Sequence, residues 1–274
     1  MRFLFIANDF PNPWQPTKGI FNLQLVRALA QQHDVQVVSP IPWIDEWRAR
    51  RRGVPPLGAK RQAMRDGIEV HHPRYYYPPK VLHSHYGWFY WHSIRATVLH
   101  LFQSHPPDVV LAYWAHPDGQ AAIYAARMAK VPAAIIVGGS DVLLITRQPS
   151  RRICVIRTLA EANAVIVVSQ YLKDKTIELG IPPEKVHVWR QGVDTTLFHP
   201  GDRIEARRRL NLPSEGPILL WVGRMVPVKA LDVLIESCAI LRSRGTAFHL
   251  YLVGDGPLRP QLQSQTAALG LLQA

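Results

Sequence analysis

The sequence of 274 residues is poor in cysteine and contains no segment typical of membrane insertion. Its two cysteines, Cys154 and Cys238, lie far apart inside apolar segments. This pattern excludes a disulfide framework and is typical of a reducing compartment. No run reaches the roughly 18 apolar residues of a spanning helix. The start, MRFLFIANDF, reads as a strand and lacks the basic start and long apolar stretch of a signal peptide. We therefore expect a cytoplasmic protein.

Motifs that would indicate several other chemistries are also absent. The sequence has no D-x-D acidic pair, no Walker motif and no G-x-S-x-G. The histidine pairs His71–His72 and His83–His85 have no cysteine or carboxylate at ligand spacing beside them. We therefore predict no metal site and no cofactor.

Acidic residues are scarce relative to basic ones. Lys and Arg number 32 against 20 Asp and Glu, which gives a formal charge of +12 and favours anionic partners. The segment Arg48–Arg65 holds seven basic residues and no acid, and the aromatic-rich stretches RYYYPPK and HYGWFYW follow it. This combination predicts attachment to an anionic membrane surface. Nucleic acid bound by stacking is a less favoured reading, and a solvated basic loop beside core aromatics is the third.

Apolar runs alternate with helical patterns, which indicates parallel βα units and an α/β fold. A complete Rossmann-like unit is predicted over residues 1–200. Its strands are Arg2–Ala7, Asp34–Ser39, Ile68–Pro73, Asp108–Tyr113, Ala133–Val137, Ala164–Ser169 and Val186–Arg190, and its helices include Ile20–Gln32, Trp88–Gln103, Asp118–Lys130 and Gln170–Leu179.

A second Rossmann-like unit is predicted over residues 201–274, and it contains only two βα units. Its predicted elements are the helices 201–212, 230–243 and 258–269 and the strands 218–222 and 249–253. Two parallel strands make a poor sheet with exposed edges. The unit therefore looks like the first part of a larger domain.

The stretch LLWVGRMVPVKALDVLI in this unit predicts an anion site. A strand ends at Gly223, Arg224 follows at once, and Lys229 lies where the next helix begins. Ligands of open α/β sheets bind at the carboxyl ends of strands, and a helix start presents free N–H groups. Arg224 and Lys229 could therefore hold a diphosphate, the first as a bidentate fork and the second as a point charge. The alternative is two solvated cations flanking a loop.

Two further glycine turns are candidates for ligand contact. LVGDGPLR carries Gly254 but fails the dinucleotide fingerprint, because Arg259 stands where the third glycine belongs. It is either a tight turn or a loop near a nucleotide base. The proline-rich loop from Asn8 closes on Gly19 at a helix start, where a ligand could approach the backbone closely. An ordinary βα loop is the alternative there.

Two polar residues follow strands in the first unit. His116 in YWAHPDG lies between a strand and a helix, so it is a candidate ligand contact, although a lone histidine is more often structural. Asp141 in VGGSDV is either a site residue or a helix cap.

The stretches FPNPWQPTKGIFNLQLVRALA, WAHPDG, GSDV, QGVDTTLFHP and VGRMVPVKALDVLIESCAILRSRG, followed by LYLVGDGPL, occur in this order along the chain. Together they resemble the retaining glycosyltransferases of family 4, which have the GT-B fold of two Rossmann-like domains. The resemblance covers nearly the whole chain. It implies transfer of a sugar from a nucleotide-sugar donor with retention of the anomeric configuration and without a metal in the chemistry.

The resemblance also implies roles for individual residues. Arg224 and Lys229 match the family's diphosphate-binding pair, with Gly223 beside them, and Gly19 matches its glycine near the diphosphate. His116 matches the histidine that contacts the donor sugar. Asp141 falls in the loop near the acceptor, so we expect His116 and Asp141 to act in catalysis and Gly254 in donor binding.

The chain departs from the family pattern in two places. Ala230 stands where the family commonly has glycine, and the Glu-x7-Glu segment that holds the donor's sugar and ribose is missing. We expect an incomplete chain that acts on a lipid-linked or cell-surface glycan acceptor at the inner face of the plasma membrane. The alternative function is a non-catalytic binding module for anionic membrane or glycan surfaces.

Overall fold

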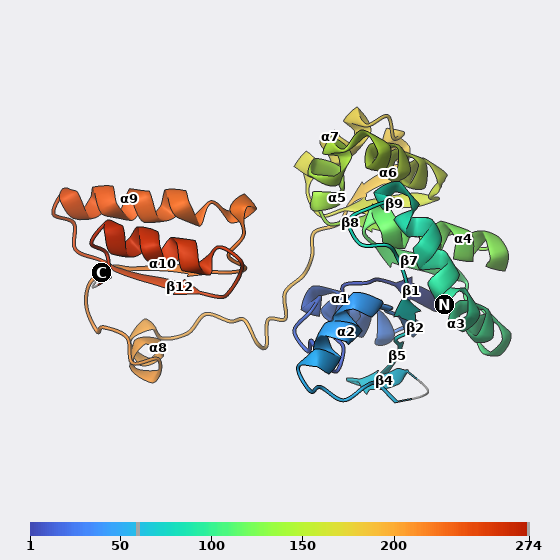
Figure 1. Cartoon of the computed structure of the whole chain (residues 1–274), viewed down its shortest axis with the longest axis horizontal. Coiled ribbons are helices and arrows are strands. Elements are labelled where there is room, and N and C mark those ends of the chain that lie inside the picture. Colours follow the sequence, from blue (N-terminus) through green and yellow to red (C-terminus); the bar gives the residue numbers. More distant parts are fainter. Residues whose placement is uncertain (59–60, 273–274) are drawn as a thin grey trace. The chain divides into compact units, whose positions relative to one another are not determined.

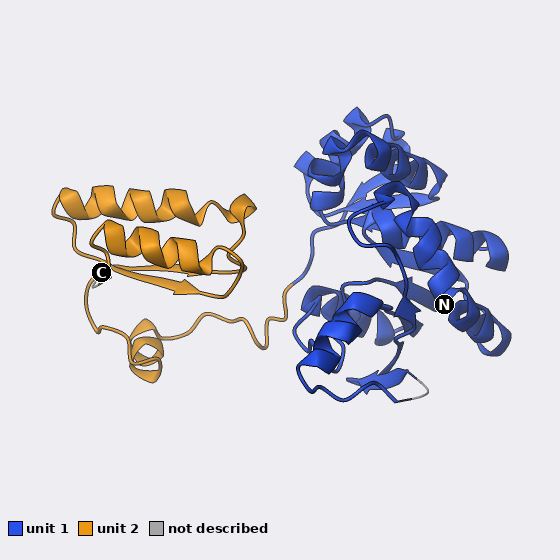
Figure 2. Cartoon of the chain, viewed as in Figure 1, with its two compact units in different colours: residues 1–192 blue, residues 193–274 orange. Residues whose placement is uncertain are grey.

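The computed structural model describes residues 1–58 and 61–272 of the chain. They form two compact units, residues 1–192 and 193–274 (Figure 2). The sequence suggested a boundary at residue 200, which lies within the exposed segment 187–206. Each unit has a hydrophobic core of its own.

Unit 1 is built on an eight-stranded sheet with the order β10-β9-β8-β7-β1-β2-β5-β4 (Figure 1). All neighbouring strands are parallel except β4 and β5. The strands are β1 (Arg2–Ile6), β2 (Asp34–Val38), β4 (Gln62–Arg65), β5 (Ile68–His71), β7 (Val109–Tyr113), β8 (Ala133–Val137), β9 (Ala164–Val167) and β10 (Val186–Val188). The seven predicted strands are confirmed, whereas β4 was not predicted.

Helices cover both faces of this sheet. Along β1, Leu4 and Ile6 pack with α3, α4 and α6 on one face, and Phe5 packs with α1 on the other. This alternation gives the doubly wound arrangement. The helices are α1 (Ile20–Ala30), α2 (Trp43–Arg51), α3 (Tyr86–Ser104), α4 (Gln120–Ala129), α5 (Ser140–Leu143), α6 (Pro149–Glu161) and α7 (Gln170–Glu178), with the short strands β3 (Ile41–Pro42) and β6 (Arg74–Tyr75) between them. Helices α2, α5 and α6 were not predicted.

Unit 2 contains two parallel strands with helices on one face (Figure 1). Its elements are α8 (Arg203–Arg209), β11 (Ile218–Val222), η5 (Pro227–Lys229), α9 (Leu231–Ser243), β12 (His249–Val253) and α10 (Arg259–Ala268). The core includes Leu231, Ile235 and Leu262 from α9 and α10. On the other face of the sheet, Leu220 and Val222 are 64% and 68% exposed. The two βα units predicted from the sequence are confirmed.

No described helix combines the length and apolar character required to cross a bilayer. The longest of them, α3, has 19 residues and packs against the sheet of unit 1.

Ala230 adopts a left-handed backbone, with φ 48° and ψ 43°, directly before α9. A side chain with a Cβ destabilises this conformation by about 1–2 kcal/mol, whereas glycine adopts it freely. We predict that Ala230→Gly raises the free energy of unfolding of unit 2 by about 1 kcal/mol in urea denaturation.

A helical alanine provides the matched control for this prediction. Ala239 lies inside α9, so Ala239→Gly should lower the free energy of unfolding by about 1 kcal/mol. Equal losses for both variants would contradict the strain assigned to Ala230.

Candidate functional site

The loops that follow β1, β7 and β8 meet at the carboxyl edge of the unit 1 sheet, because these three strands are neighbours. Asp118 lies in the turn η2 (Ala115–Gly119) after β7 and connects this turn to the end of β1 and to α3. Its buried carboxylate accepts hydrogen bonds from the backbone N–H of Asn8 and from the Tyr90 hydroxyl, the latter at 3.1 Å. Burial raises the pKa of Asp118 to about 7. No sequence motif marks Asp118 as a site residue, because its partners Asn8 and Tyr90 are distant in the chain.

His116 lies two residues before Asp118 and is 1% exposed. Its Nε2 is 3.0 Å from the carbonyl oxygen of His83, and since a carbonyl only accepts, Nε2 carries the proton and donates. Burial lowers the pKa of His116 to about 4, so the ring is neutral at pH 7. Nδ1, buried beside Gln120, keeps a lone pair that can accept a hydrogen bond. The predicted contact of His116 with a ligand stays a prediction.

Asp141 is fully buried in the first turn of α5. Its carboxylate accepts backbone N–H bonds from Ala115, Gly139 and Val142 at 3.1, 2.9 and 3.2 Å. Burial raises the pKa of Asp141 to about 6, while these hydrogen bonds act in the opposite direction. These bonds join the start of α5, whose N-cap is Gly139, to the turn that follows β7. A catalytic role for Asp141 stays a prediction.

Gly19 has φ 59° and stands directly before α1. A Cβ at this position would lie 2.1 Å from the carbonyl oxygen of Asp9, so the loop after β1 can close only on a glycine. Asp9 also accepts a hydrogen bond from Trp114 Nε1 at 3.2 Å and pairs with Lys18 at 3.7 Å. The packing of the loop itself therefore requires Gly19, and its approach to a diphosphate stays a prediction.

In unit 2, two glycine-bearing turns pack against each other at the carboxyl ends of β11 and β12. The Gly223 N–H donates to the Val253 carbonyl oxygen at 3.0 Å. A Cβ on Gly254 would lie 1.8 Å from the Gly223 carbonyl oxygen, and one on Gly256 would lie 2.4 Å from that of Met225. The glycines of VGDGPL therefore allow backbone contact between the two turns, which fixes the position of the Arg224 backbone.

Arg224 and Lys229 are exposed in the segment that follows β11, which packs against the glycine turn after β12. Neither side chain makes a hydrogen bond or ion pair with any residue that the structure describes. The sequence placed Lys229 where the next helix begins; in the structure Lys229 ends η5, and α9 begins at Leu231. Both cations are free to bind an anion at the carboxyl end of β11.

The described part of the basic segment Arg48–Arg65 comprises the end of α2, residues 52–58 and strand β4, and Lys60 lies outside the described residues. Its Arg61 binds the buried carboxylate of Glu46, which also accepts a 2.7 Å ion pair from Arg74. Burial opposes ionisation of Glu46, but hydrogen bonds from Arg74 and Arg61 outweigh it and lower its pKa. Arg51 lies over the ring of Trp47, 4.0 Å from its centroid. Glu46, which was not predicted to matter, thus neutralises part of the positive charge of this segment.

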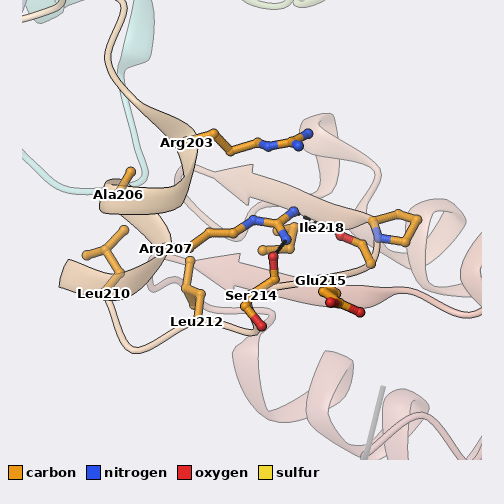
Figure 3. A pocket seen from close by; sticks show the side chains of 10 residues that line it. Arg203, Ala206, Arg207, Leu210, Leu212, Ser214, Glu215 and Ile218 are labelled. Carbon is orange, nitrogen blue, oxygen red and sulfur yellow. Dashed lines mark hydrogen bonds between the residues drawn. The ribbon is translucent and has the colours of Figure 1, made fainter.

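A pocket of about 780 Å³ opens between α8 and the loop before β11 (Figure 3). Arg207 bonds the carbonyl oxygens of Pro213, Ser214 and Gly216 at 3.2, 2.8 and 2.9 Å. The guanidinium is therefore used to hold the loop. This pocket lies at the amino end of β11, whereas Gly223 and Arg224 follow the carboxyl end.

Two family models match the chain. The model described as Glycosyltransferase Family 4 matches residues 19–197, and the one described as Glycosyl transferases group 1 matches residues 202–274. The chain belongs to glycosyltransferase family 4. The resemblance found in the sequence is thereby confirmed at the level of the family.

Among curated relatives, the teichuronic acid biosynthesis glycosyltransferase TuaC of Bacillus subtilis is 27% identical over 276 residues, covering 96% of this chain and 67% of TuaC. The D-inositol 3-phosphate glycosyltransferase of Thermobispora bispora is 34% identical over 128 residues, covering 41% of this chain and 30% of that enzyme. The chain thus spans about two thirds of the length of TuaC.

Solved structures confirm the predicted GT-B type of fold. Anabaena HepE in complex with UDP-glucose has a TM-score of 0.66 at 19% identity, covering 100% of this chain and 67% of HepE. The lipopolysaccharide outer core galactosyltransferase WaaB has a TM-score of 0.56 at 14% identity, covering 100% and 66%. The UDP-GlcNAc 2-epimerase of Methanocaldococcus jannaschii has a TM-score of 0.55. Because an epimerase shares the fold, these likenesses specify architecture and not reaction.

The buried carboxylate of Asp118 makes stability depend on pH. Its pKa is raised from 3.8 to about 7, so the folded state binds its proton more tightly than the unfolded state does. The contribution of Asp118 to the free energy of unfolding is therefore most favourable below pH 4 and is lost as the pH rises through 7. We predict that stability measured relative to Asp118→Asn falls between pH 4 and pH 8, by at most about 4 kcal/mol.

Asp34→Asn is the control for this measurement, since Asp34 is exposed. Urea denaturation across the pH range measures both differences. For each variant, the quantity compared is its difference in free energy of unfolding from the unmodified chain. If this difference depends on pH no more for Asp118→Asn than for Asp34→Asn, the raised pKa of Asp118 is ruled out.

Proposed function

We propose that the chain transfers a glycosyl group from a nucleoside diphosphate sugar to a glycan or lipid-linked acceptor, with retention of the anomeric configuration. The supporting observation is the pair of exposed, unpaired cations Arg224 and Lys229 beside the glycine turns of unit 2. HepE, a structural neighbour, was crystallised with UDP-glucose. The family relatives are named as glycosyltransferases, so nothing favours the alternative of a non-catalytic binding module.

The proposed chemistry follows from charge. When the glycosidic bond of the donor breaks, negative charge develops on the leaving diphosphate. Arg224 as a planar fork and Lys229 as a point charge would stabilise that charge. In this proposal the neutral ring of His116 lies against the donor sugar, and Asp141 holds the acceptor-side loop in place.

Arg224→Ala tests the donor site. A hydrogen bond to a charged group contributes about 1.5–3 kcal/mol, so we predict nucleoside diphosphate affinity weakened about tenfold to a hundredfold. Calorimetric titration of the full chain with UDP, GDP and ADP measures this change without assuming the base.

Arg244→Ala is the matched control, because Arg244 is an exposed arginine after α9 in the same unit. It should leave the affinity unchanged. Equal affinities for Arg224→Ala and the unmodified chain would refute the assignment of the diphosphate site.

We also propose that the end of α2 holds the protein on an anionic membrane surface. Arg50 and Arg52 are exposed, and Trp47 beside them is 46% exposed. Each cation near such a surface contributes about 1 kcal/mol. The double substitution Arg50→Gln with Arg52→Gln should therefore lower the affinity for phosphatidylserine vesicles about thirtyfold at low salt. Vesicle sedimentation measures this affinity.

Arg242→Gln with Arg244→Gln, two exposed arginines of unit 2, is the control pair for vesicle binding. Added salt should weaken binding of the unmodified chain, because surface charges are screened. Equal binding to neutral and anionic vesicles would exclude the electrostatic attachment.

A further inference from the structure

Trp114 has a backbone conformation that is unfavourable for a residue with a side chain. Its φ is 84° and its ψ is 132°, a combination that glycine adopts freely and an aromatic residue rarely does. Such a conformation persists only where the surrounding contacts hold it in place. Because Trp114 joins the end of β7 to the turn η2, the contacts that hold Trp114 also decide where His116 of that turn lies.

Two hydrogen bonds hold the backbone of Trp114. Its N–H donates to the carbonyl oxygen of Ile136 on β8 at 3.0 Å, and its carbonyl oxygen accepts the N–H of Gly119 at 2.9 Å. The second bond closes the turn that contains His116. A Cβ on Gly119 would lie 2.9 Å from that carbonyl oxygen, so the turn can close this tightly because residue 119 is glycine.

The indole of Trp114 is held by the loop that follows β1. Its Nε1 donates to the carboxylate of Asp9 at 3.2 Å. The backbone of Asp9 is itself fixed, since its carbonyl oxygen accepts a hydrogen bond from Asn22 Nδ2 on α1 at 2.6 Å. The Asp9 carboxylate has a longer contact of 3.7 Å with Lys18. Asp9 therefore presents a fixed acceptor to Trp114.

Two consecutive residues of this loop bind the turn on both sides of His116. Asp9 accepts the bond from Trp114, which lies two residues before His116. The N–H of Asn8 donates to the carboxylate of Asp118, which lies two residues after His116. His116 between them is buried. The loop after β1 thus holds the main chain at both ends of the segment that carries the histidine.

We propose that Asp9 and Trp114 are positioning residues for His116. Their hydrogen bond keeps Trp114 in its strained conformation, and the turn that starts from Trp114 directs the His116 ring towards the carbonyl oxygen of His83. The consequence for the reaction rests on the proposed function, in which His116 lies against the donor sugar. Displacement of such a group by about 1 Å can lower a rate about a hundredfold.

NMR of the histidine rings tests this proposal in the full chain without a ligand. Long-range proton–nitrogen spectra at pH 8, where imidazole is neutral, distinguish the two tautomers, and the His116 signals are those absent from His116→Gln. In the unmodified chain Nε2 should carry the proton, because it donates to the His83 carbonyl oxygen. Asp9→Ala and Trp114→Phe should each lower the ratio of the Nε2–H to the Nδ1–H tautomer about two- to tenfold, the equivalent of one neutral hydrogen bond.

Asp9→Asn is the conservative variant, because an amide oxygen can still accept the bond from Trp114 Nε1. It should keep the tautomer ratio of the unmodified chain. Lys18→Gln, which removes the other contact of the Asp9 carboxylate, is the matched control and should also keep that ratio. An unchanged ratio in Asp9→Ala and Trp114→Phe would overturn the proposal. So would an equal fall in Asp9→Asn, because the charge of Asp9 rather than its bond to Trp114 would then act on the ring.

The double variant Asp9→Ala with Trp114→Phe separates the loss of this bond from a general loss of packing. Both single changes remove the same bond, so the double variant should lower the tautomer ratio no further than either change alone. Additive falls in the ratio would overturn the proposal.

This proposal and the proposed function are refuted by different measurements. The affinity for UDP reports the site at Arg224 in unit 2, whereas the tautomer ratio of His116 is measured without a ligand in unit 1. An Arg224→Ala variant that binds UDP normally would refute the donor site alone. An unchanged tautomer ratio would overturn the positioning of His116 alone.

The strain at Trp114 is tested by comparing Trp114→Gly with Trp114→Ala. Both variants lose the indole and its bond to Asp9, so they differ only by the Cβ. Glycine in most positions destabilises a fold relative to alanine, because it loses more conformational freedom on folding. At residue 114 the order should be reversed, with the unfolding temperature of Trp114→Gly higher by about 2 °C or more. A lower unfolding temperature for Trp114→Gly would show that the conformation is not strained and would overturn the proposal.

Discussion

The buried carboxylate of Asp118 is the contact on which the carboxyl edge of unit 1 depends. It accepts the N–H of Asn8 at the end of β1 and the hydroxyl of Tyr90 on α3, while its own backbone belongs to the turn after β7. Three elements distant in sequence are thereby held together, and the same turn carries His116. Asp141 repeats the arrangement between the ends of β7 and β8. The rigid edge that results is where we place the acceptor.

The arginines of this protein fall into two groups that differ in what surrounds them. Arg61 and Arg74 share the carboxylate of Glu46, so their charges serve the fold. Arg151 and Arg224 make no such pair with any residue in the described part of the chain. An excess of basic residues therefore does not identify binding sites by itself. Arg224, at the carboxyl end of β11, is the cation that we propose binds the donor.

Patterns in contiguous residues predicted most of the strands. Contacts between residues distant in the sequence could not be predicted. The run 133–137 predicts a buried strand because parallel strands covered on both faces lack polar alternation. The edge strand β4 is polar and pairs with one neighbour only, so its available signal was the Asp66–Gly67 turn. The bond between Asn8 and Asp118 joins residues 110 positions apart, and no local pattern encodes it. The motif around Arg224 was predictable because strand end, glycine and cation are contiguous.

The central claim is that a nucleoside diphosphate binds at the carboxyl end of β11. Two-dimensional amide NMR of the full chain, titrated with UDP, tests it most directly because every backbone N–H of unit 2 reports separately. The account predicts that the largest shifts fall on Gly223, Arg224, Lys229 and Gly254. Largest shifts at Arg203, Arg207 and Ile218, which line the pocket at the opposite end of β11, would contradict it.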